Sequence, residues 1–431
     1  MRDPNEIAKY GLDALLRAGA EKAQCSLALS QKHEMNVDAG QMSLFRTTFD
    51  AQMNLTAIKN GRKGSTSVNK STDAAIQAAA TEALGLADSA EPDDANDIAE
   101  YQAPKESASG SESPDTDKMH FRMKELLSTV KKRYPRISLQ QAVLEFTRNR
   151  RYFVNSNGVD FAGSQGVYRY SIMFSGVDGE KVSSFNYTGL SAKDLDKPLL
   201  ESGTLDTLLK QAEEQVITTP LSGKFVGDVI MTPDSIGDML GFLVGSIGDG
   251  ALISGTSIYK DRVGQKVASP LFTVHSKPIS EEICDGYFFT LDGYEAQNST
   301  IVDRGMLKGL LLSLYGSKKT GRPRAVNQGH AWVIEPGDTP LKEMVKSVKR
   351  GVLLARFSGG DPSDNGDFSG VAKNSYLIED GQVKYPISES MISGNFAEML
   401  MSINAVSREQ VNFGYMIAPW IKASGVTVSG K

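Results

Sequence analysis

The stretch FDAQMNLTAIKNGRKGSTSVN, residues 49–69, combines a strand, a tight turn and a returning strand, and this unit decides the fold of the first half of the chain. Alternate residues of its first part are apolar, so one face of the expected strand carries Phe49, Ala51, Met53, Leu55 and Ala57. The dipeptide Asn60-Gly61 favours a two-residue hairpin turn, because both residue types tolerate positive φ. Residues 64–69 are mostly small and polar and form the return strand.

Helical patterns flank this hairpin on both sides. Before it, Asp3 can cap a helix that has Pro4 at its first position and Glu6 three residues after the cap. Gly19 ends this helix, since glycine readily adopts the left-handed conformation found at helix ends. After the hairpin, four apolar residues at helical spacing predict a second helix with one buried face: Ile76, Ala79, Ala80 and Ala83.

The same order of elements recurs in residues 118–221. A helix over residues 121–132 precedes a long strand, and the strand after it carries Tyr168, Tyr170, Ile172 and Phe174 on one face. Asp178-Gly179 predicts the turn of a second hairpin, followed by a return over residues 182–186 and a closing helix over residues 208–216. We therefore expect duplicated strand-hairpin-helix units at the N-terminus.

Residues 88–117 interrupt this pattern. They are rich in Asp, Glu, Ser, Pro and Ala, a composition typical of a solvated acidic linker. From residue 222 onward, turn signals such as Asp292-Gly293 and Asp380-Gly381 separate short strands. The predicted fold class is α+β, with α+β domains at 1–87 and 118–221, a linker at 88–117 and a β-rich C-terminal domain at 222–431.

The composition is that of an ordinary globular protein and excludes several function classes. The chain has 431 residues and a formal net charge of −5, so it lacks the excess of basic residues that holds nucleic acid by bulk electrostatics. Two cysteines are too few for a disulfide framework or a cysteine-rich zinc module. We find no apolar run long enough for a membrane span and no secretory signal, and we expect a cytoplasmic protein.

Three short motifs resemble known chemical sites, and each lacks an essential residue. His33-Glu34 starts like the zinc motif H-E-x-x-H, but Val37 stands where the second histidine belongs. Residues 316–323 imitate a phosphate-binding loop without its closing Lys-Ser/Thr pair, and we interpret them as a basic loop that could touch an acidic peptide or partner. Residues 361–367 begin like a calcium loop that lacks its final acid, which favours a simple cluster of turns.

Motifs spread over nearly the whole chain resemble the TldD/PmbA family, once described as modulators of DNA gyrase and known as subunits of a zinc metallopeptidase. In the first domain these motifs are residues 45–50 and 64–67. In the last domain they are residues 335–339, 348–353, 356–360, 366–369, 387–389, 393–396 and 426–431. Each motif is short, and their combination makes the resemblance specific.

The family has two branches, which differ at the first helix of the last domain. The TldD branch carries H-E-x-x-x-H there, and a cysteine near the C-terminus is its third zinc ligand. The corresponding positions here, counted back from Gly255, are Leu240, Gly241 and Gly245, and none of these residues binds zinc. No cysteine follows Cys284. The chain therefore resembles the PmbA branch, also called TldE, which pairs with a TldD subunit.

The resemblance implies a non-catalytic subunit of a cytoplasmic metallopeptidase, with no metal or cofactor in this chain and zinc in a TldD-like partner. Its substrates would be unfolded or short peptides that bind in extended form along a sheet edge, in peptide maturation or antitoxin degradation. Two alternatives stay open: a stand-alone homodimer that binds peptides without cutting them, and a hydrolase with relocated catalytic groups. Whether this chain is itself an enzyme is left undecided by the residues.

The glycine-containing segment after residue 355 is the predicted substrate or partner surface. The residues proposed for it are Arg356, Phe357, Ser358, Gly359, Gly360 and Asn395. The competing hypothesis is a core hairpin, in which Phe357 packs inside and Arg356 makes a structural ion pair.

Overall fold

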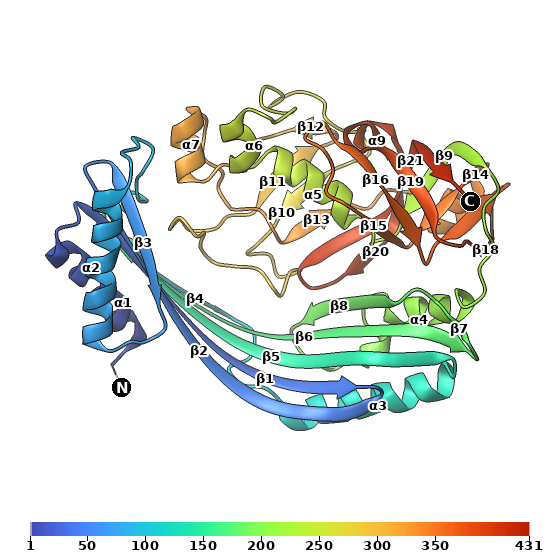
Figure 1. Ribbon diagram of the computed structural model, residues 1–431, viewed down its shortest axis with the longest axis horizontal. Coiled ribbons are helices and arrows are strands. Elements are labelled where there is room, and N and C mark those ends of the chain that lie inside the picture. The colour runs from blue at the N-terminus through green and yellow to red at the C-terminus, as the bar shows by residue number, and fades with distance from the viewer. Residues whose placement is uncertain (1, 431) are drawn as a thin grey trace.

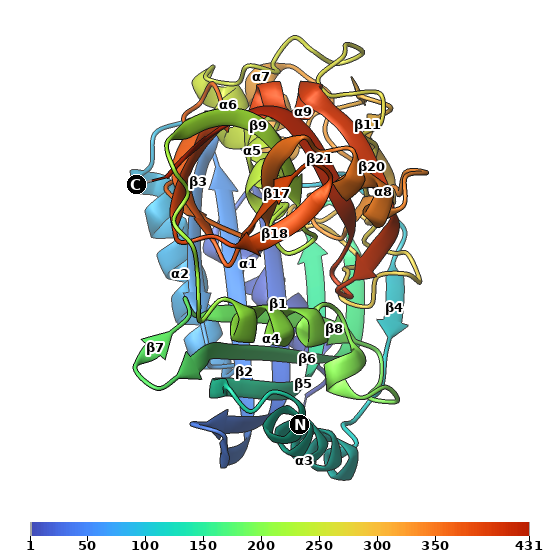
Figure 2. The ribbon, with the colours of Figure 1, turned by 90° about the vertical axis from the view of Figure 1, so that its right-hand side faces the viewer.

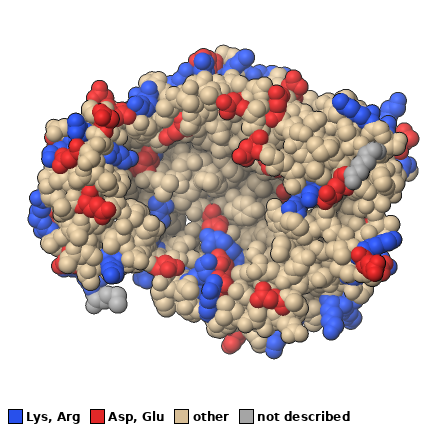
Figure 3. Space-filling view, viewed as in Figure 1, with Lys and Arg blue, Asp and Glu red and all other residues tan. Residues whose placement is uncertain are grey.

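The protein consists of two parts that face each other across a hollow (Figure 1, Figure 3). The computed structural model describes residues 2–430, so Met1 and Lys431, the last residue of the C-terminal family motif, lie outside the described residues. The N-terminal part is a long curved sheet, and the C-terminal part lies above its concave face (Figure 1). Figure 2 shows the same arrangement from the side, with the long strands passing beneath the C-terminal part. The α+β fold class is confirmed.

Residues 2–221 form the helices and strands of the N-terminal part. The helices are α1 (Pro4–Ala18), α2 (Asp73–Ser89), α3 (Thr116–Arg133), the 3-10 helix η1 (Leu199–Glu201) and α4 (Leu205–Glu214). The strands are β1 (Lys22–Asp38), β2 (Gln41–Lys59), β3 (Arg62–Val68), β4 (Lys105–Ser109), β5 (Ile137–Asn155), β6 (Asp160–Asp178), β7 (Lys181–Val182) and β8 (Asn186–Ala192).

The duplicated unit is confirmed, and the two copies share one sheet. Each copy runs helix, two long antiparallel strands, short return strand and helix: α1-β1-β2-β3-α2 and α3-β5-β6-β8-α4. The strand order is β3-β2-β1-β5-β6, and β8 and β4 pair with different stretches of β6. The central contact is the antiparallel pairing of β1 with β5, so the two units form a single layer of strands. The second return strand, β8, begins at Asn186, later than the sequence pattern indicated.

The first hairpin forms as expected. Asn60 and Gly61 have φ values of 51° and 71°, the left-handed values that a type I′ turn requires. Three of the five apolar residues expected on one face of β2 lie in the core that α1 and α2 cover: Met53, Leu55 and Ala57. Phe49 differs from the expectation, because its side chain is 73% exposed. The return strand β3 pairs only with Met53–Lys59, so the earlier half of β2 extends beyond its cover.

The structure corrects the prediction that residues 88–117 are a solvated linker. Ala95, Ile98 and Ala99 are buried, and β4 pairs in parallel with β6. The Nδ2 atom of Asn96 donates a hydrogen bond of 2.9 Å to the carbonyl oxygen of Gly61. Three buried apolar residues among many acids do not change the composition enough to be noticed, which is why the sequence pattern favoured a linker.

The basic segment 316–323 is not a loop over its full length. It includes most of helix α7 (Leu314–Thr320), which begins after Ser313. The hydroxyl oxygen of Ser313 accepts a hydrogen bond of 3.2 Å from the backbone N–H of Gly316, as an N-cap residue does. Gly321 ends the helix with a φ of 67°.

Helix α7 forms ion pairs with the acidic segment between α2 and β4. The Nζ atom of Lys319 lies 2.8 Å from Oδ2 of Asp93, and Lys318 pairs with Asp97. The hydroxyl of Tyr315 donates to Asp93 at 2.8 Å. Hydrogen bonding from Lys319 lowers the pKa of the Asp93 carboxyl to about 2. The acidic and basic segments therefore bind each other and join the two parts of the chain at one end of the hollow (Figure 1).

The C-terminal part is β-rich and includes five short helices within residues 222–430. The helices are α5 (Gly237–Ser246), α6 (Asp249–Ser254), α7, α8 (Leu341–Lys346) and α9 (Phe396–Ser402). The strands are β9 (Lys224–Met231), β10 (Val274–Ser276), β11 (Ser299–Asp303), β12 (Met306–Leu307), β13 (Trp332–Ile334), β14 (Arg350–Leu354), β15 (Arg356–Gly359), β16 (Asp367–Lys373), β17 (Tyr376–Glu379), β18 (Gln382–Pro386), β19 (Ser390–Asn395), β20 (Ile403–Asn412) and β21 (Met416–Ser429).

The long strand β21 organises the C-terminal sheet. It pairs with β9, β13, β19 and β20, and α5 and α9 pack beside it in the largest hydrophobic core. Along residues 2–430, we find no helix with the length and apolar character needed to cross a membrane.

Replacing Asp93 and Asp97 together by Asn tests the contact between α7 and the acidic segment. We expect the melting temperature to fall by several degrees, because Lys318 and Lys319 both lose their anionic partner. Asp94→Asn is the matched control, since the Asp94 side chain is exposed, and it should leave the melting temperature unchanged. Equal melting temperatures for the double variant and the wild type would show that the contact does not stabilise the fold.

Asp234 makes a second contact between the two parts. It lies between β9 and α5, and its Oδ1 atom accepts hydrogen bonds from the hydroxyls of Thr204 (2.9 Å) and Thr188 (3.2 Å). Burial raises the pKa of Asp234 to about 6, although the two hydroxyl donors act in the opposite direction. Above pH 6 the folded protein therefore holds a carboxylate that burial makes less stable than the same group in water.

Because the pKa of Asp234 is higher in the folded state than its ordinary 3.8, folding takes up a proton between pH 4 and pH 6. The stability that this group contributes is present at low pH and is lost as the pH rises through about 6. We expect Asp234→Asn to raise the free energy of unfolding at pH 7.5, by at most about 3 kcal/mol, and to make little difference at pH 4. Denaturant titration at both pH values measures this, and an equal effect at both would contradict it.

Candidate functional site

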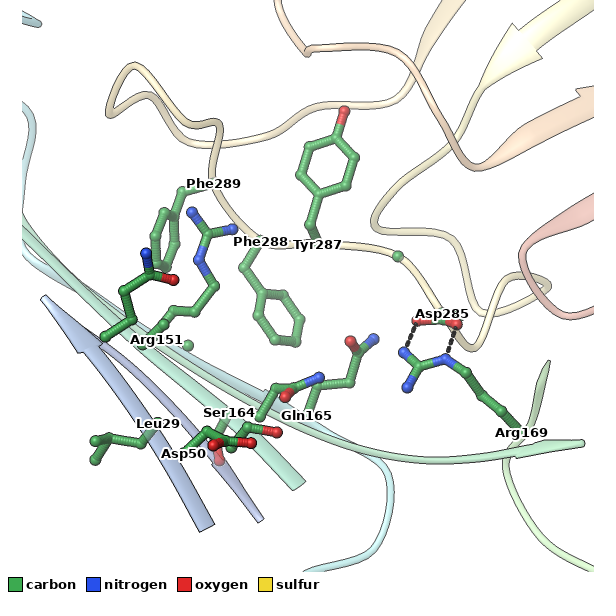
Figure 4. A pocket seen from close by; sticks show the side chains of 16 residues that line it. Leu29, Asp50, Arg151, Ser164, Gln165, Arg169, Asp285, Tyr287, Phe288 and Phe289 are labelled. Atoms are coloured by element: carbon green, nitrogen blue, oxygen red, sulfur yellow. Dashed lines mark hydrogen bonds and ion pairs between the residues drawn. The ribbon is translucent and has the colours of Figure 1, made fainter. Parts of the chain in front are cut away.

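A pocket of about 370 Å³ lies between the concave face of the N-terminal sheet and the loop 285–289 (Figure 4). Two rows of side chains that cross four strands form its floor, because directly paired residues of neighbouring strands face the same side. One row consists of Gln52, Ala28, Arg151 and Gly163. The next row consists of Asp50, Ser30, Asn149 and Gln165. Side chains from the first copy and the second copy of the duplicated unit thus contribute to one pocket.

An ion pair fixes the roof of this pocket to its floor. The Nε and Nη2 atoms of Arg169 each lie 2.6 Å from a carboxylate oxygen of Asp285, a bidentate geometry (Figure 4). Ser191 donates a further hydrogen bond of 2.7 Å to Asp285. Burial by itself would lower the pKa of Arg169, but hydrogen bonding and attraction by Asp285 raise it overall. The loop is therefore held at a defined height above the sheet.

A second groove, of about 430 Å³, runs along α5. Gly241, Phe242 and Gly245 line one wall, and residues 361–364 line the other. Leu240 lies in the core instead and is only 4% exposed. Of the three positions that correspond to the histidine, glutamate and histidine of the family motif, two reach the groove and one does not.

These three residues do not fit a zinc ion. Zinc in proteins is bound by thiolate, imidazole or carboxylate groups. Gly241 and Gly245 have no side chain, and the side chain of Leu240 is hydrocarbon. Within residues 2–430, no group of three or more His, Cys, Asp or Glu residues is arranged to hold a metal ion. The Nδ1 atom of His275 lies 2.9 Å from Oγ1 of Thr300 on the neighbouring strand β11, and its Nε2 atom lies 2.9 Å from Oε1 of Glu335. Both ring nitrogens therefore have hydrogen-bond partners within the C-terminal part.

Five of the six residues predicted for a substrate or partner surface lie on β15 and β19, the two strands that flank β16, and Gly360 follows the end of β15. Ser358 and Gly359 pair with β16, and Asn395 ends β19 beside Asp367. Asn395 caps α9 by accepting a hydrogen bond of 3.1 Å from the backbone N–H of Glu398. Gly360 follows the last residue of β15 and precedes residues 361–364, which form one wall of the α5 groove. Residues 361–364, which come next in the chain, line the α5 groove, whereas the six predicted residues are not among the residues that line it.

Phe357 and Arg356 make contacts within the chain. The Phe357 ring packs edge-on against Phe368, with 5.5 Å between the ring centroids, and belongs to the edge of the main core. The guanidinium carbon of Arg356 lies 4.2 Å from the ring centroid of Phe185 and 4.7 Å from that of Tyr187. Its Nη1 atom also donates a hydrogen bond of 2.7 Å to the carbonyl oxygen of Phe185. Arg356 thus contacts two aromatic rings of the N-terminal part, and among residues 2–430 it makes no ion pair with a carboxylate.

No pattern in the sequence predicts the pocket beneath loop 285–289. Arg169 and Asp285 are 116 positions apart, and nothing local to either residue points to the other. The one available signal was the doublet Phe288-Phe289 next to Tyr287, an aromatic run in a turn-rich region.

Comparison with known proteins identifies the class of protein. A family model described as the PmbA/TldA metallopeptidase C-terminal domain matches residues 222–430, and the model of metallopeptidase domain 1 matches residues 30–87. These matches define a metallopeptidase-type fold. The chain belongs to the PmbA/TldD family.

Relatives cover the whole length of the chain. A Metalloprotease PmbA homolog of Haemophilus influenzae is 23% identical over an alignment of 449 positions, which covers 97% of this chain and 96% of the relative. The crystal structure of TldE from Thermococcus kodakarensis superposes with a TM-score of 0.81 at 20% identity and covers 99% of each chain. A structure from Bacteroides thetaiotaomicron, solved as a candidate modulator of DNA gyrase, has a TM-score of 0.88 at 20% identity and covers 100% of each chain. At these identities, the two structures establish the fold.

Substituting Arg356 by Ala separates a structural role from a binding role. Every contact of Arg356 described above lies within the chain, so we expect a melting temperature lowered by a few degrees and unchanged partner binding in the folded fraction. Arg356→Lys keeps the cation and should restore part of the stability. A normal melting temperature with lost association would instead assign Arg356 to a binding surface.

Proposed function

We propose that this chain is a non-catalytic subunit of a cytoplasmic TldD/TldE-type metallopeptidase that acts on unfolded or short peptides. The observation that carries the proposal is the wall of the α5 groove. At the positions where the TldD branch has the glutamate and the second histidine of its motif, this wall offers Gly241 and Gly245. These residues supply neither a metal ligand nor a base, so zinc and the hydrolytic step belong to a TldD-like partner.

An open sheet edge supports the proposal of a partner subunit. Residues 41–52 of β2 pair with β1 on one side, and β3 begins to cover the other side only at Met53. Four large apolar side chains along this edge are exposed: Met42, Leu44, Phe45 and Phe49. A long apolar strand edge exposed to water promotes pairing with another chain. We propose that a second subunit with the same fold adds its strands here.

Extended peptides are the proposed substrates. The hollow between the two parts is lined by polar side chains of the curved sheet, among them Asn149 and Gln165. Amide side chains can hydrogen-bond to the main chain of any peptide, whatever its sequence. Such a surface suits substrates that are recognised mainly by their extended backbone.

The second candidate is a homodimer that binds peptides without cutting them. The β2 edge favours it as well, because antiparallel pairing of the same strand around a two-fold axis produces a closed dimer. The two candidates differ in the identity of the second subunit and in the presence of peptidase activity.

Mixing the purified chain with a TldD-like subunit from the same organism tests the proposal. We expect a one-to-one complex by analytical ultracentrifugation, hydrolysis of an unstructured fluorogenic peptide by the complex, and no hydrolysis by this chain alone. Elemental analysis of this chain should find far less than one zinc per molecule. One tightly bound zinc per chain, together with peptidase activity of the isolated chain, would refute the proposal. A homodimer that does not bind the TldD-like subunit would favour the second candidate.

A variant with Asp at positions 45 and 49, Phe45→Asp with Phe49→Asp, tests the proposed edge. We expect the affinity for the partner to fall at least tenfold with an unchanged melting temperature, because the two charges would be desolvated in the interface. Phe121→Asp is the matched control, since Phe121 is also an exposed phenylalanine, 58% accessible, but lies on α3. Equal affinity of the double variant and the control would place the interface elsewhere.

A further inference from the structure

Arg151 is a cation without an anionic partner in the interdomain pocket. It projects from β5 toward loop 285–289, and its guanidinium carbon lies 5.1 Å from the ring centroid of Phe289 (Figure 4). No carboxylate or other hydrogen-bond acceptor within residues 2–430 pairs with this guanidinium. Arg169 lines the same pocket and differs from Arg151, because its guanidinium donates two hydrogen bonds to the carboxylate of Asp285.

The surroundings of Arg151 make an unpaired charge unfavourable. Its side chain is partly buried, and this desolvation lowers the pKa of the guanidinium. Arginine nevertheless stays protonated in proteins, so five N–H donors remain available in the pocket. A desolvated cation gains more from an incoming anion than a fully hydrated one, because less water has to be displaced.

The neighbours of Arg151 define the part of a ligand that lies next to its anion. Gly163 is the direct strand partner of Arg151, and a Cβ atom at Gly163 would lie 3.1 Å from the rings of both Phe288 and Phe289. The absence of that atom lets the two rings approach the sheet beside the guanidinium. Ala28, the partner on the other side, is also small and apolar. A ligand anion at Arg151 would therefore have apolar groups beside it.

The negative charge of Asp50 limits the kinds of anion that the pocket can bind. Asp50 is exposed and belongs to the next row of the floor, and the strand β1 separates it from β5. Its negative charge disfavours phosphates and other multiply charged ligands, whereas a single carboxylate is repelled less. The amides of Asn149 and Gln165 lie in the same row and can bind peptide groups.

We propose that Arg151 binds the carboxylate of a short peptide, with Phe288 and Phe289 contacting the apolar side chain beside it. This inference rests on the proposed function in taking peptides as ligands. The carboxylate can belong to the C-terminus of the peptide or to an acidic side chain. Planar bidentate pairing with carboxylate is the geometry for which arginine is suited.

A small probe tests the site independently of peptide binding. Titration of the full chain with 3-phenylpropanoate, followed by ligand-observed NMR, should show binding at least tenfold tighter than that of the uncharged 3-phenylpropanamide. Arg151→Gln should remove this difference. Arg150→Gln is the matched control, because Arg150 is the preceding residue on the same strand, is exposed and points to the opposite face. Equal binding of the acid and the amide to the wild-type chain would overturn the carboxylate site, whether or not the variant folds.

Peptides then distinguish the two sources of the carboxylate. Three fluorescein-labelled hexapeptides ending in phenylalanine are compared by anisotropy: one with a free C-terminus, its C-terminal amide, and an amide with an internal glutamate. Tighter binding of the first or of the third supports the proposal and identifies the source, provided that Arg151→Gln abolishes the gain. Equal affinities for all three overturn the carboxylate site and leave peptide binding intact. If 3-phenylpropanoate binds through Arg151 but no peptide binds, the proposed peptide function fails while the anion site itself stands.

Discussion

The antiparallel pairing of β1 with β5 is the interaction on which the rest of the structure depends. It runs without interruption from Gln24 opposite Asn155 to Asp38 opposite Gln141. Each duplicated unit alone would be a three-stranded sheet with one long strand left unpaired at its edge. Their union satisfies the backbone groups of both edges and creates a single sheet long enough to curve beneath the C-terminal part (Figure 1).

The curvature of this sheet explains why the pocket forms where it does. Side chains alternate between the two faces of a strand, so the convex face buries apolar residues under helices while the concave face presents polar rows. Loop 285–289 then approaches the concave face, where Arg169 holds it through Asp285. Arg151, on the same face, has no carboxylate partner among residues 2–430, so two arginines of one sheet differ in whether their charge is paired.

The chain thus has the fold of a metallopeptidase family, but the side chains at its α5 groove differ from the H-E-x-x-x-H motif of the TldD branch. Gly241 and Gly245 keep the groove along α5 open, and Leu240 turns into the core. The long edge of β2, with Phe45 and Phe49 exposed, extends away from the groove toward solvent. A chain with an open strand edge, and with no ligand side chain at Leu240, Gly241 and Gly245, is suited to assembly with another chain, which is the physical basis of the proposed function.

The sequence by itself determined the local features: the cap at Asp3, the turn at Asn60-Gly61 and the lack of ligand side chains at Leu240. Each depends on the chemistry of a few adjacent residues, which is the same in the unfolded chain and in the folded one. The tertiary structure alone decided that Asp97 pairs with Lys318, 221 positions later, and that Arg151 has no carboxylate partner among residues 2–430. The burial of a side chain and the pairing of its charge depend on all residues that surround it in space. The curved sheet brings together residues that are far apart in the sequence, so no local sequence pattern predicts these contacts.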